Sequence, residues 1–417
     1  MKKKLLLLIM SGSLFLAGFF FSCTKETTLS DSFQETEELN LKSAPTKFVL
    51  TPKEQLGRYL YFDKISSPNS MACADCHSPL FGFTGPNVGT NIHGSVHRGA
   101  DAQNFGDRKP PSAAYATFSP ILHKEKDRTF VGGNFWDGRA TGETLGSPAA
   151  EQALGPFLNS AEHNLPDMLS VLQKIAKAKY ISMWKEVWGE PFTYAVEKIA
   201  LNYDRVGLSI AAFEGSPEVN QFSSKYDFSL KGLVKLTAEE EWGLKLFNSA
   251  DDGKCAQCHP SITPDGDGGL FTDFTFDNLG VPKNPQNPVY KYNPTFIDPG
   301  LGGYLATRED YSGYADANWG KHKVPTLRNV AKKPGLGVTK AYMHNGVFKT
   351  LQEVVDFYDR GGDKGSNKSA LLRPLSLSTQ DKNDLVAFME ALSMTEPLIH
   401  DDPKLPGDYQ PLPAPVK

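Results

Sequence analysis

Two Cys-x-x-Cys-His segments constrain this chain more than any other feature of its sequence. Cys73, Cys76 and His77 form the first segment, and Cys255, Cys258 and His259 form the second. Covalent attachment of haem needs two thiols that reach its vinyl groups and an imidazole that reaches the iron from the same turn of chain. Both segments supply these groups at the required spacing. The sequence therefore predicts two c-type haems, with His77 and His259 as iron ligands.

Other uses of paired cysteines fit this pattern less well. Four cysteines in an exported protein usually form two disulfides, but here a histidine directly follows each pair. Two zinc knuckles usually lie close together in sequence and do not need a histidine after both. A redox Cys-x-x-Cys motif is expected once, at a strand-to-helix turn. The repeated histidine favours haem over these three alternatives.

The first 22 residues have the pattern of an export signal. Lys2, Lys3 and Lys4 precede an apolar run from Leu5 to Phe21, and Ser22-Cys23 follows. The run is short for a membrane anchor. A small residue before cysteine resembles a lipoprotein processing site, so we expect lipidation of Cys23 rather than simple cleavage. Residues 23–46 form a polar tether, and the protein is expected in the periplasm or cell envelope.

The rest of the chain predicts a mainly α protein with two cytochrome c-like helical haem domains and long loops. A threonine N-cap with a glutamate in the first turn precedes each haem segment, at Thr51 and again at Thr237. Leu56, Tyr59 and Leu60 fall on one helical face, as do Trp242 and Leu246. We place the first domain at 47–225 and the second at 226–417.

Further helices are expected over 169–187, 196–212 and 380–392, and no segment has a convincing strand pattern. Residues 78–135 and 260–325 are rich in glycine and proline and are long for plain connections, so we expect them to wall the haems. The formal net charge is −4, and no long basic run occurs outside the N-terminus. Nothing in the sequence therefore indicates nucleic acid as a partner.

Five motifs in order give the chain a family resemblance over about residues 47–395. They are Leu56–Asp63, Phe135–Ala140, Glu151–Pro156, Val324–Val330 and Tyr342–Gly346. Together they resemble the bacterial di-haem cytochrome c peroxidases and their relative MauG. The resemblance implies peroxide chemistry at the N-terminal haem, with Glu162 as the catalytic glutamate. It also implies catalytic roles for Gln152 and for Trp136 between the haems, and it places His344 near the domain interface.

The second ligand of the C-terminal haem departs from the peroxidase pattern. Peroxidases of the family have methionine where this chain has Tyr358, and MauG has tyrosine there. A phenolate ligand would favour ferric iron, whereas a thioether would favour ferrous iron. Tyr358 could equally continue the apolar face of its helix. Met389 and Met394 are more distant alternative ligands.

A second departure concerns the N-terminal haem and calcium. His93 and His97 lie near the place of a removable histidine ligand, and we name His93 as the candidate metal ligand. Arg108-Lys109-Pro110-Pro111 replaces the stretch whose asparagine helps to hold calcium in the family. Lysine cannot bind a cation in that way, so calcium is doubtful.

The sequence thus favours a peroxidase that reduces hydrogen peroxide with electrons relayed through the C-terminal haem. The electron donor is expected to be a protein such as a small cytochrome or a cupredoxin. Two alternatives stay open. One is a MauG-like oxidase of a protein substrate, which Tyr358 favours, and the other is a non-enzymatic electron carrier.

Overall fold

The computed structural model describes residues 48–394, except for 86–87, 128, 264–267, 334, 336 and 366. The predicted signal, the tether and the lipidation site at Cys23 lie outside the described residues. Within the described part of the chain, no helix combines the length and the apolar character that a bilayer crossing requires.

The prediction of a mainly α fold is confirmed. The helices are α1 (Pro52–Phe62), α2 (Cys73–Cys76), α3 (Val88–Ile92), α4 (Pro148–Leu158), α5 (Met168–Ile175), α6 (Trp184–Trp188), α7 (Ile199–Glu214), α8 (Lys225–Leu230), α9 (Ala238–Asn248), α10 (Val289–Tyr292), α11 (Gly300–Leu305), α12 (Leu351–Asp359) and α13 (Thr379–Glu390). Two short antiparallel ribbons join them. Strand β1 (His123–Lys124) pairs with β2 (Phe130–Val131), and β3 (Phe276–Asp277) pairs with β4 (His322–Lys323).

The two predicted helices before the haem segments are confirmed as α1 and α9. Each begins with a capping box, in which the threonine side chain accepts a hydrogen bond from the glutamate amide three residues later. Each also carries a glycine where another helix crosses closely. A Cβ on Gly57 of α1 would lie 1.8 Å from Ser209 O of α7, and one on Gly243 of α9 would lie 2.0 Å from Asp384 O of α13. The two repeats therefore resemble each other both in their helix caps and in their close helix crossings.

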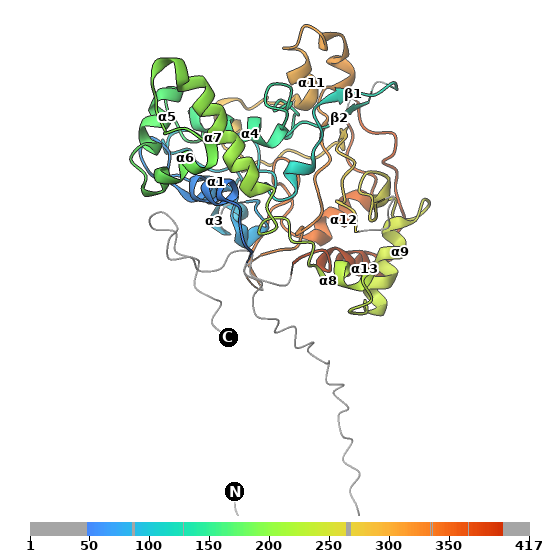
Figure 1. Ribbon diagram of the computed structural model, residues 1–417. Coiled ribbons are helices and arrows are strands. Elements are labelled where there is room, and N and C mark those ends of the chain that lie inside the picture. Colours follow the sequence, from blue (N-terminus) through green and yellow to red (C-terminus); the bar gives the residue numbers. More distant parts are fainter. Residues whose placement is uncertain are drawn as a thin grey trace, which may run out of the picture. The chain divides into compact units, whose positions relative to one another are not determined.

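Two helical cores surround these repeats (Figure 1). In the first core, α1, α4 and α5 pack against α7, and in the second, α9 and α12 pack against α13. A smaller apolar cluster joins β2, β3 and α11. Met394 crosses back to the first core, where it contacts the hydroxyl of Tyr115. The division of the chain near residue 225 stays a prediction.

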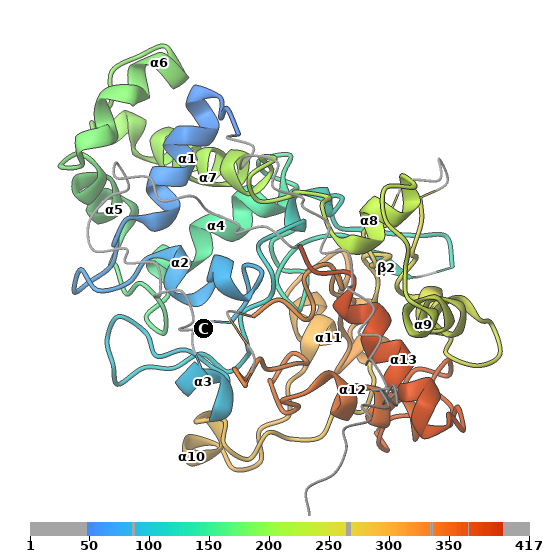
Figure 2. The ribbon, with the colours of Figure 1, turned by 90° about the horizontal axis from the view of Figure 1, so that it is seen from below.

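The long loops of the two halves interlock. In Figure 2, α3 of the N-terminal half lies beside α10 of the C-terminal half. The Asn284 amide nitrogen, in the loop before α10, donates to Gly94 O just after α3 at 3.1 Å. Lys340 is buried and donates to Phe81 O at 2.9 Å and to Asn329 O at 2.7 Å. The segments expected to wall the haems therefore also join the halves.

Three sequence predictions need correction. The helix expected over 169–187 is broken into α5, a 3-10 turn and α6, because Ala178 adopts an extended conformation between them. The helix expected over 196–212 starts with a 3-10 turn at Val196–Lys198 and continues as α7. Trp242 does not join the core: its side chain is exposed, and its indole N–H donates to Asp381 at 2.9 Å.

Candidate functional site

The two Cys-x-x-Cys-His segments have related local structures. Cys73–Cys76 form the short helix α2, and Cys255–Gln257 form a 3-10 turn. All four cysteines are free thiols. Burial raises the pKa of each thiol, to about 12 in Cys255 and Cys258. These segments therefore hold neither disulfides nor the low-pKa thiolates expected of a redox motif.

Each histidine of these segments is held through its Nδ1 atom. His77 Nδ1 lies 2.9 Å from Pro111 O, and His259 Nδ1 lies 2.7 Å from Phe271 O. A carbonyl acceptor at Nδ1 favours the tautomer in which Nε2 is free to bind a metal. Burial lowers the pKa of His77 to about 4 and also lowers that of His259, so both rings are neutral near pH 7. Both histidines thus suit a haem iron.

A cavity of about 690 Å³ adjoins the second segment and is lined by Cys255, Cys258 and His259. Its volume falls in the range of about 300–1,000 Å³ that is typical of cofactor pockets. Trp136 and Tyr358 also line it. We call it the C-terminal cavity.

Among the six lysines that line the C-terminal cavity, three have a pKa that burial lowers, and no described carboxylate lies within ion-pair distance of these three. They are Lys109, Lys323 and Lys340. Burial lowers the pKa of Lys109 and Lys323 to about 7, and it lowers that of Lys340 strongly. Because buried charges are normally paired, this cavity suits an anionic occupant. A haem carries two propionate carboxylates, so its charge and its size both fit.

A second, smaller cavity of about 70 Å³ adjoins the first segment and is lined by His77 and Gln152. Trp136 lines this cavity as well as the C-terminal one. Its indole N–H donates to Lys109 O at 2.7 Å, and its carbonyl accepts from the amide of Lys323 at 2.9 Å. Trp136 is therefore a fixed wall shared by the two cavities.

Glu162 lies in the turn after α4, near the first segment. Its Oε2 accepts a hydrogen bond of 2.8 Å from the Asn159 side chain. Burial raises the pKa of Glu162, while Asn159 and the charge of Arg139 oppose the rise. The carboxylate in turn helps to raise the pKa of the Cys76 thiol. Glu162 lines neither cavity, but a carboxylate of raised pKa at this place suits proton transfer.

Tyr358 lies at the end of α12, in the wall of the C-terminal cavity. Leu351, Val355 and Tyr358 fall at i, i+4 and i+7 on one face of α12, and all three line the cavity. The neighbouring Phe357 is fully buried on another face of the helix. Among the described residues, the Tyr358 hydroxyl has no hydrogen-bond partner. Burial raises its pKa, and the nearby Cys258 thiol adds to the rise. This placement is compatible with both the ligand role and the core role of Tyr358.

The other candidate ligands lie in different surroundings. His93 is exposed after α3 and lines neither cavity. His97 is half-buried, with Nδ1 2.5 Å from Arg98 O. Met389 is buried in the second core and reaches the C-terminal cavity, whereas Met394 belongs to the first core.

Calcium does not fit the position of Lys109. The Lys109 ammonium lies 2.5 Å from Thr84 Oγ1 and 3.1 Å from Pro110 O. Calcium takes six to eight oxygen ligands, usually including carboxylates. Here a buried ammonium contacts these oxygens, and no carboxylate among the described residues pairs with it. No step is therefore assigned to calcium.

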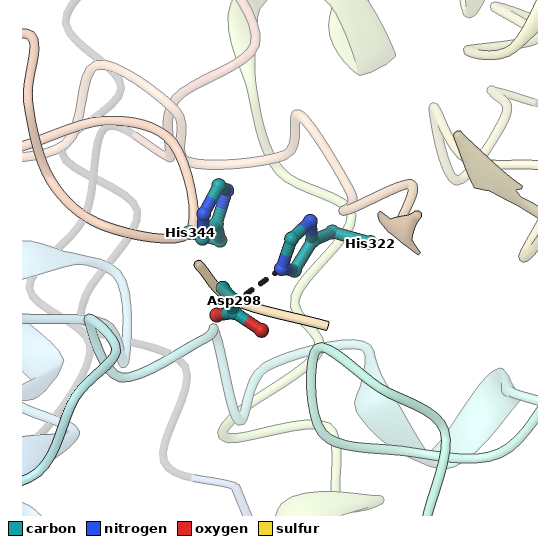
Figure 3. A group of neighbouring side chains, drawn as sticks. All are labelled: Asp298, His322 and His344. Atoms are coloured by element: carbon teal, nitrogen blue, oxygen red, sulfur yellow. Dashed lines mark ion pairs between the residues drawn. The ribbon is translucent and has the colours of Figure 1, made fainter. Parts of the chain in front are cut away.

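Sequence reasoning missed a group formed by Asp298, His322 and His344 (Figure 3). One potential ligand atom from each residue lies within 4.8 Å of the others. Only His344 belonged to a recognised motif. His322 directly precedes the lysine before Val324–Val330, and Asp298 lies in a loop without any pattern. Nothing in the sequence indicated that these three residues meet.

Comparison with known proteins gives a consistent result. The family described as "Di-haem cytochrome c peroxidase" matches residues 51–235. "Cytochrome-c peroxidase IdrP1" of Pseudomonas sp. (strain SCT) is 32% identical over 90% of this chain and 91% of its own length. "Methylamine utilization protein MauG" of Paracoccus denitrificans (strain Pd 1222) is 33% identical over 73% of each chain. The crystal structure of the "diheme peroxidase BthA" from Burkholderia thailandensis E264 superposes with a TM-score of 0.70 at 28% identity, covering 84% of this chain and 88% of that one.

Proposed function

Because this chain belongs to the family of di-haem cytochrome c peroxidases and MauG, we propose that it is a peroxidase that reduces hydrogen peroxide to water. The balanced reaction takes one peroxide, two electrons and two protons to two waters. The electrons come from an external donor protein such as a small cytochrome or a cupredoxin. The predicted export signal places this reaction in the periplasm or cell envelope, with Cys23 as the proposed site of a lipid anchor.

The chain would hold one haem at each cysteine-histidine segment, through thioether bonds to the four cysteines. His77 and His259 would present Nε2 to the irons, since their Nδ1 atoms are held by carbonyls. When bound, the haem irons supply peroxide binding and electron storage. The uncompensated lysines around the C-terminal cavity support an anionic group there.

We assign peroxide reduction to the His77 side. Glu162 would take a proton from the inner peroxide oxygen and deliver it to the outer one, which makes water the leaving group. Its raised pKa supports this role, because a carboxyl that holds its proton more strongly is a better base towards peroxide. Gln152 would help to orient peroxide from the wall of the smaller cavity.

The observation that carries this proposal is the place of Trp136. It lines both cavities and is held at each end by a hydrogen bond. Among the described residues that line both cavities, Trp136 is the one with an aromatic side chain. We propose that electrons from the C-terminal site pass by way of Trp136.

Tyr358 favours a second candidate function. Its place in the C-terminal cavity supports phenolate ligation, which disfavours ferrous iron and therefore electron entry from ordinary carriers. In that case the protein is a MauG-like oxidase, in which peroxide-derived oxidising equivalents are used on a protein substrate. A pure electron carrier remains the third candidate.

The test is peroxide consumption by the purified di-haem protein with a reduced small cytochrome, recorded beside visible and electron paramagnetic resonance spectra. We expect two donor electrons per peroxide, and in Tyr358→Phe a change in the spectrum of one haem only. Peroxide consumption without donor oxidation would favour the oxidase. No peroxide consumption, with two six-coordinate haems before and after partial reduction, would refute both enzymatic functions.

A further inference from the structure

The side chain of Trp136 has an aromatic neighbour in His344. His344 meets the Trp136 ring edge to face, with centroids 6.4 Å apart and planes at 69°. The carbonyl of His344 accepts from the amide of Lys109 at 2.7 Å, and Lys109 O accepts the Trp136 indole N–H. The position of His344 therefore bears directly on that of Trp136.

His344 is itself held by a second histidine. His322 stacks on it with ring centroids 3.6 Å apart and planes at 8° (Figure 3). His322 Nε2 lies 3.2 Å from Asp298 Oδ2, a close polar contact without hydrogen-bond geometry. His322 and Asp298 are both about nine-tenths buried in their side chains. Burial and the neighbouring His322 strongly lower the pKa of His344, which keeps the His344 imidazole neutral.

Arg108 closes this set of contacts into a ring. Its Nε and Nη2 donate to the two oxygens of Asp298, both at 2.7 Å. Its Nη1 donates to Asp137 at 2.5 Å, and Asp137 directly follows Trp136 in the chain. The contacts thus run from Trp136 through His344, His322, Asp298, Arg108 and Asp137 back to Trp136. Bidentate arginine–carboxylate pairs are geometrically specific. This closed series of contacts is therefore well suited to fixing the side chain of Trp136.

A metal ion is a poorer explanation of the same residues. Two parallel rings at 3.6 Å cannot both direct a nitrogen lone pair, which lies in the ring plane, at one ion. Both oxygens of Asp298 already accept from Arg108, and Oδ1 also accepts from the amide of Gly300 at 2.9 Å. The guanidinium charge would in addition repel a cation at this place.

We infer that Arg108, Asp298 and His322 are positioning residues that hold His344 against Trp136 and so fix the contact between the two proposed haem sites. The inference rests on the proposed function, since it assumes that electrons pass between the cavities by way of Trp136. Asp298 and His322 also line the C-terminal cavity, so haem content and visible spectra must be compared between variants to separate positioning from direct contact with the haem. The contribution of the three residues is the geometry of Trp136, on which the rate of electron exchange through this side chain depends.

The experiment measures electron exchange between the two haems in the holo-protein after rapid one-electron reduction, without peroxide. We compare wild type with Asp298→Asn, His322→Ala and His322→Phe. Asp310→Asn is the matched control, because Asp310 also accepts a bidentate pair, from Arg308, but at an exposed site. We expect Asp298→Asn and His322→Ala to slow exchange severalfold. His322→Phe should recover most of the loss, because it keeps the stacked ring.

If these residues only stabilised the fold, their replacement would change haem content and spectra as well as the exchange rate. Haem content, visible spectra and the KM for peroxide should stay at wild-type values while the exchange rate and kcat fall together. Wild-type exchange in Asp298→Asn and His322→Ala would overturn the inference, as would equal losses in Asp310→Asn. An exchange rate in His322→Phe as low as in His322→Ala would show that stacking is not the cause and would also overturn it.

A zinc titration tests the metal explanation in the same samples. We expect no stoichiometric binding of Zn²⁺ that depends on His322. Binding of one Zn²⁺ per chain to wild type, lost in His322→Ala, would overturn the positioning role. Electron exchange is measured without peroxide. The exchange prediction can therefore be refuted in a protein that still reduces peroxide, and peroxide reduction can be absent in a protein whose exchange behaves as predicted. The two proposals can therefore be refuted separately.

Discussion

The N-terminal and C-terminal halves share one construction but differ at the cofactor face. Both have a capped helix, a glycine at a close helix crossing, and a histidine held at Nδ1 by a carbonyl. The C-terminal half surrounds its segment with a large cavity that includes Tyr358 and unpaired lysines. The N-terminal half has a small cavity with Gln152, and Glu162 of raised pKa nearby.

This difference suggests how one motif can serve two tasks. The shared features hold a haem, and they are set by helix packing and backbone contacts. The features that differ are individual side chains, namely the proposed proton-transfer group Glu162 in a turn on one side and the candidate phenolate ligand Tyr358 at the end of α12 on the other. Catalytic and binding residues are commonly placed on loops carried by a rigid scaffold. The duplicated scaffold thus leaves each half free to acquire its own chemistry.

The largest expected effect comes from removing the acid–base group of the N-terminal half. Glu162→Gln should lower kcat/KM for peroxide about 100- to 10,000-fold, since it removes a general base. The raised pKa predicts that wild-type activity falls as the pH drops through a value above 4.5, because the carboxyl becomes protonated. Steady-state rates from pH 4 to pH 8 test both points. Glu143→Gln, at an exposed ion pair with Arg308, should behave as wild type.

A weaker effect is expected where the halves are alike. Gly57→Ala and Gly243→Ala should each destabilise the protein by about 1–3 kcal/mol, because the new methyl group forces two helix backbones apart. Thermal unfolding of the holo-protein measures the loss. Gly313→Ala is the control, as a Cβ there meets nothing within 4 Å. A loss of stability in only one of the two variants would show that the two repeats are not structurally equivalent.

The smallest effect is expected from removing divalent cations. The Lys109 ammonium contacts Thr84 Oγ1 and Pro110 O, where the family resemblance implied a calcium ligand, so EGTA should leave the visible spectra and the melting temperature unchanged. Lys109→Asn restores an oxygen ligand and should gain a calcium-dependent melting temperature that Lys109→Met lacks. Bound calcium in the wild type, measured by mass spectrometry, would contradict this expectation.

Local features of the fold followed well from local sequence. The capping boxes at Thr51 and Thr237 predicted α1 and α9, because hydrogen bonds between residues three apart need no tertiary context. The helix expected over 169–187 was wrong, because an apolar period does not show where the backbone turns away to follow the core. Trp242 was wrong for a similar reason: helical spacing gives a face, but not what covers it.

The sequence by itself determined the two attachment segments, since thiols and imidazole must be neighbours in the chain to reach one haem. It also determined the family, through motifs spread along the whole chain. Only the tertiary structure decided that Trp136 is shared by two cavities and that Tyr358 lines the larger one. It alone brought Asp298 and His322 to His344. Those contacts join loops far apart in sequence, and they depend on how the helical cores place the loops, which no local pattern records.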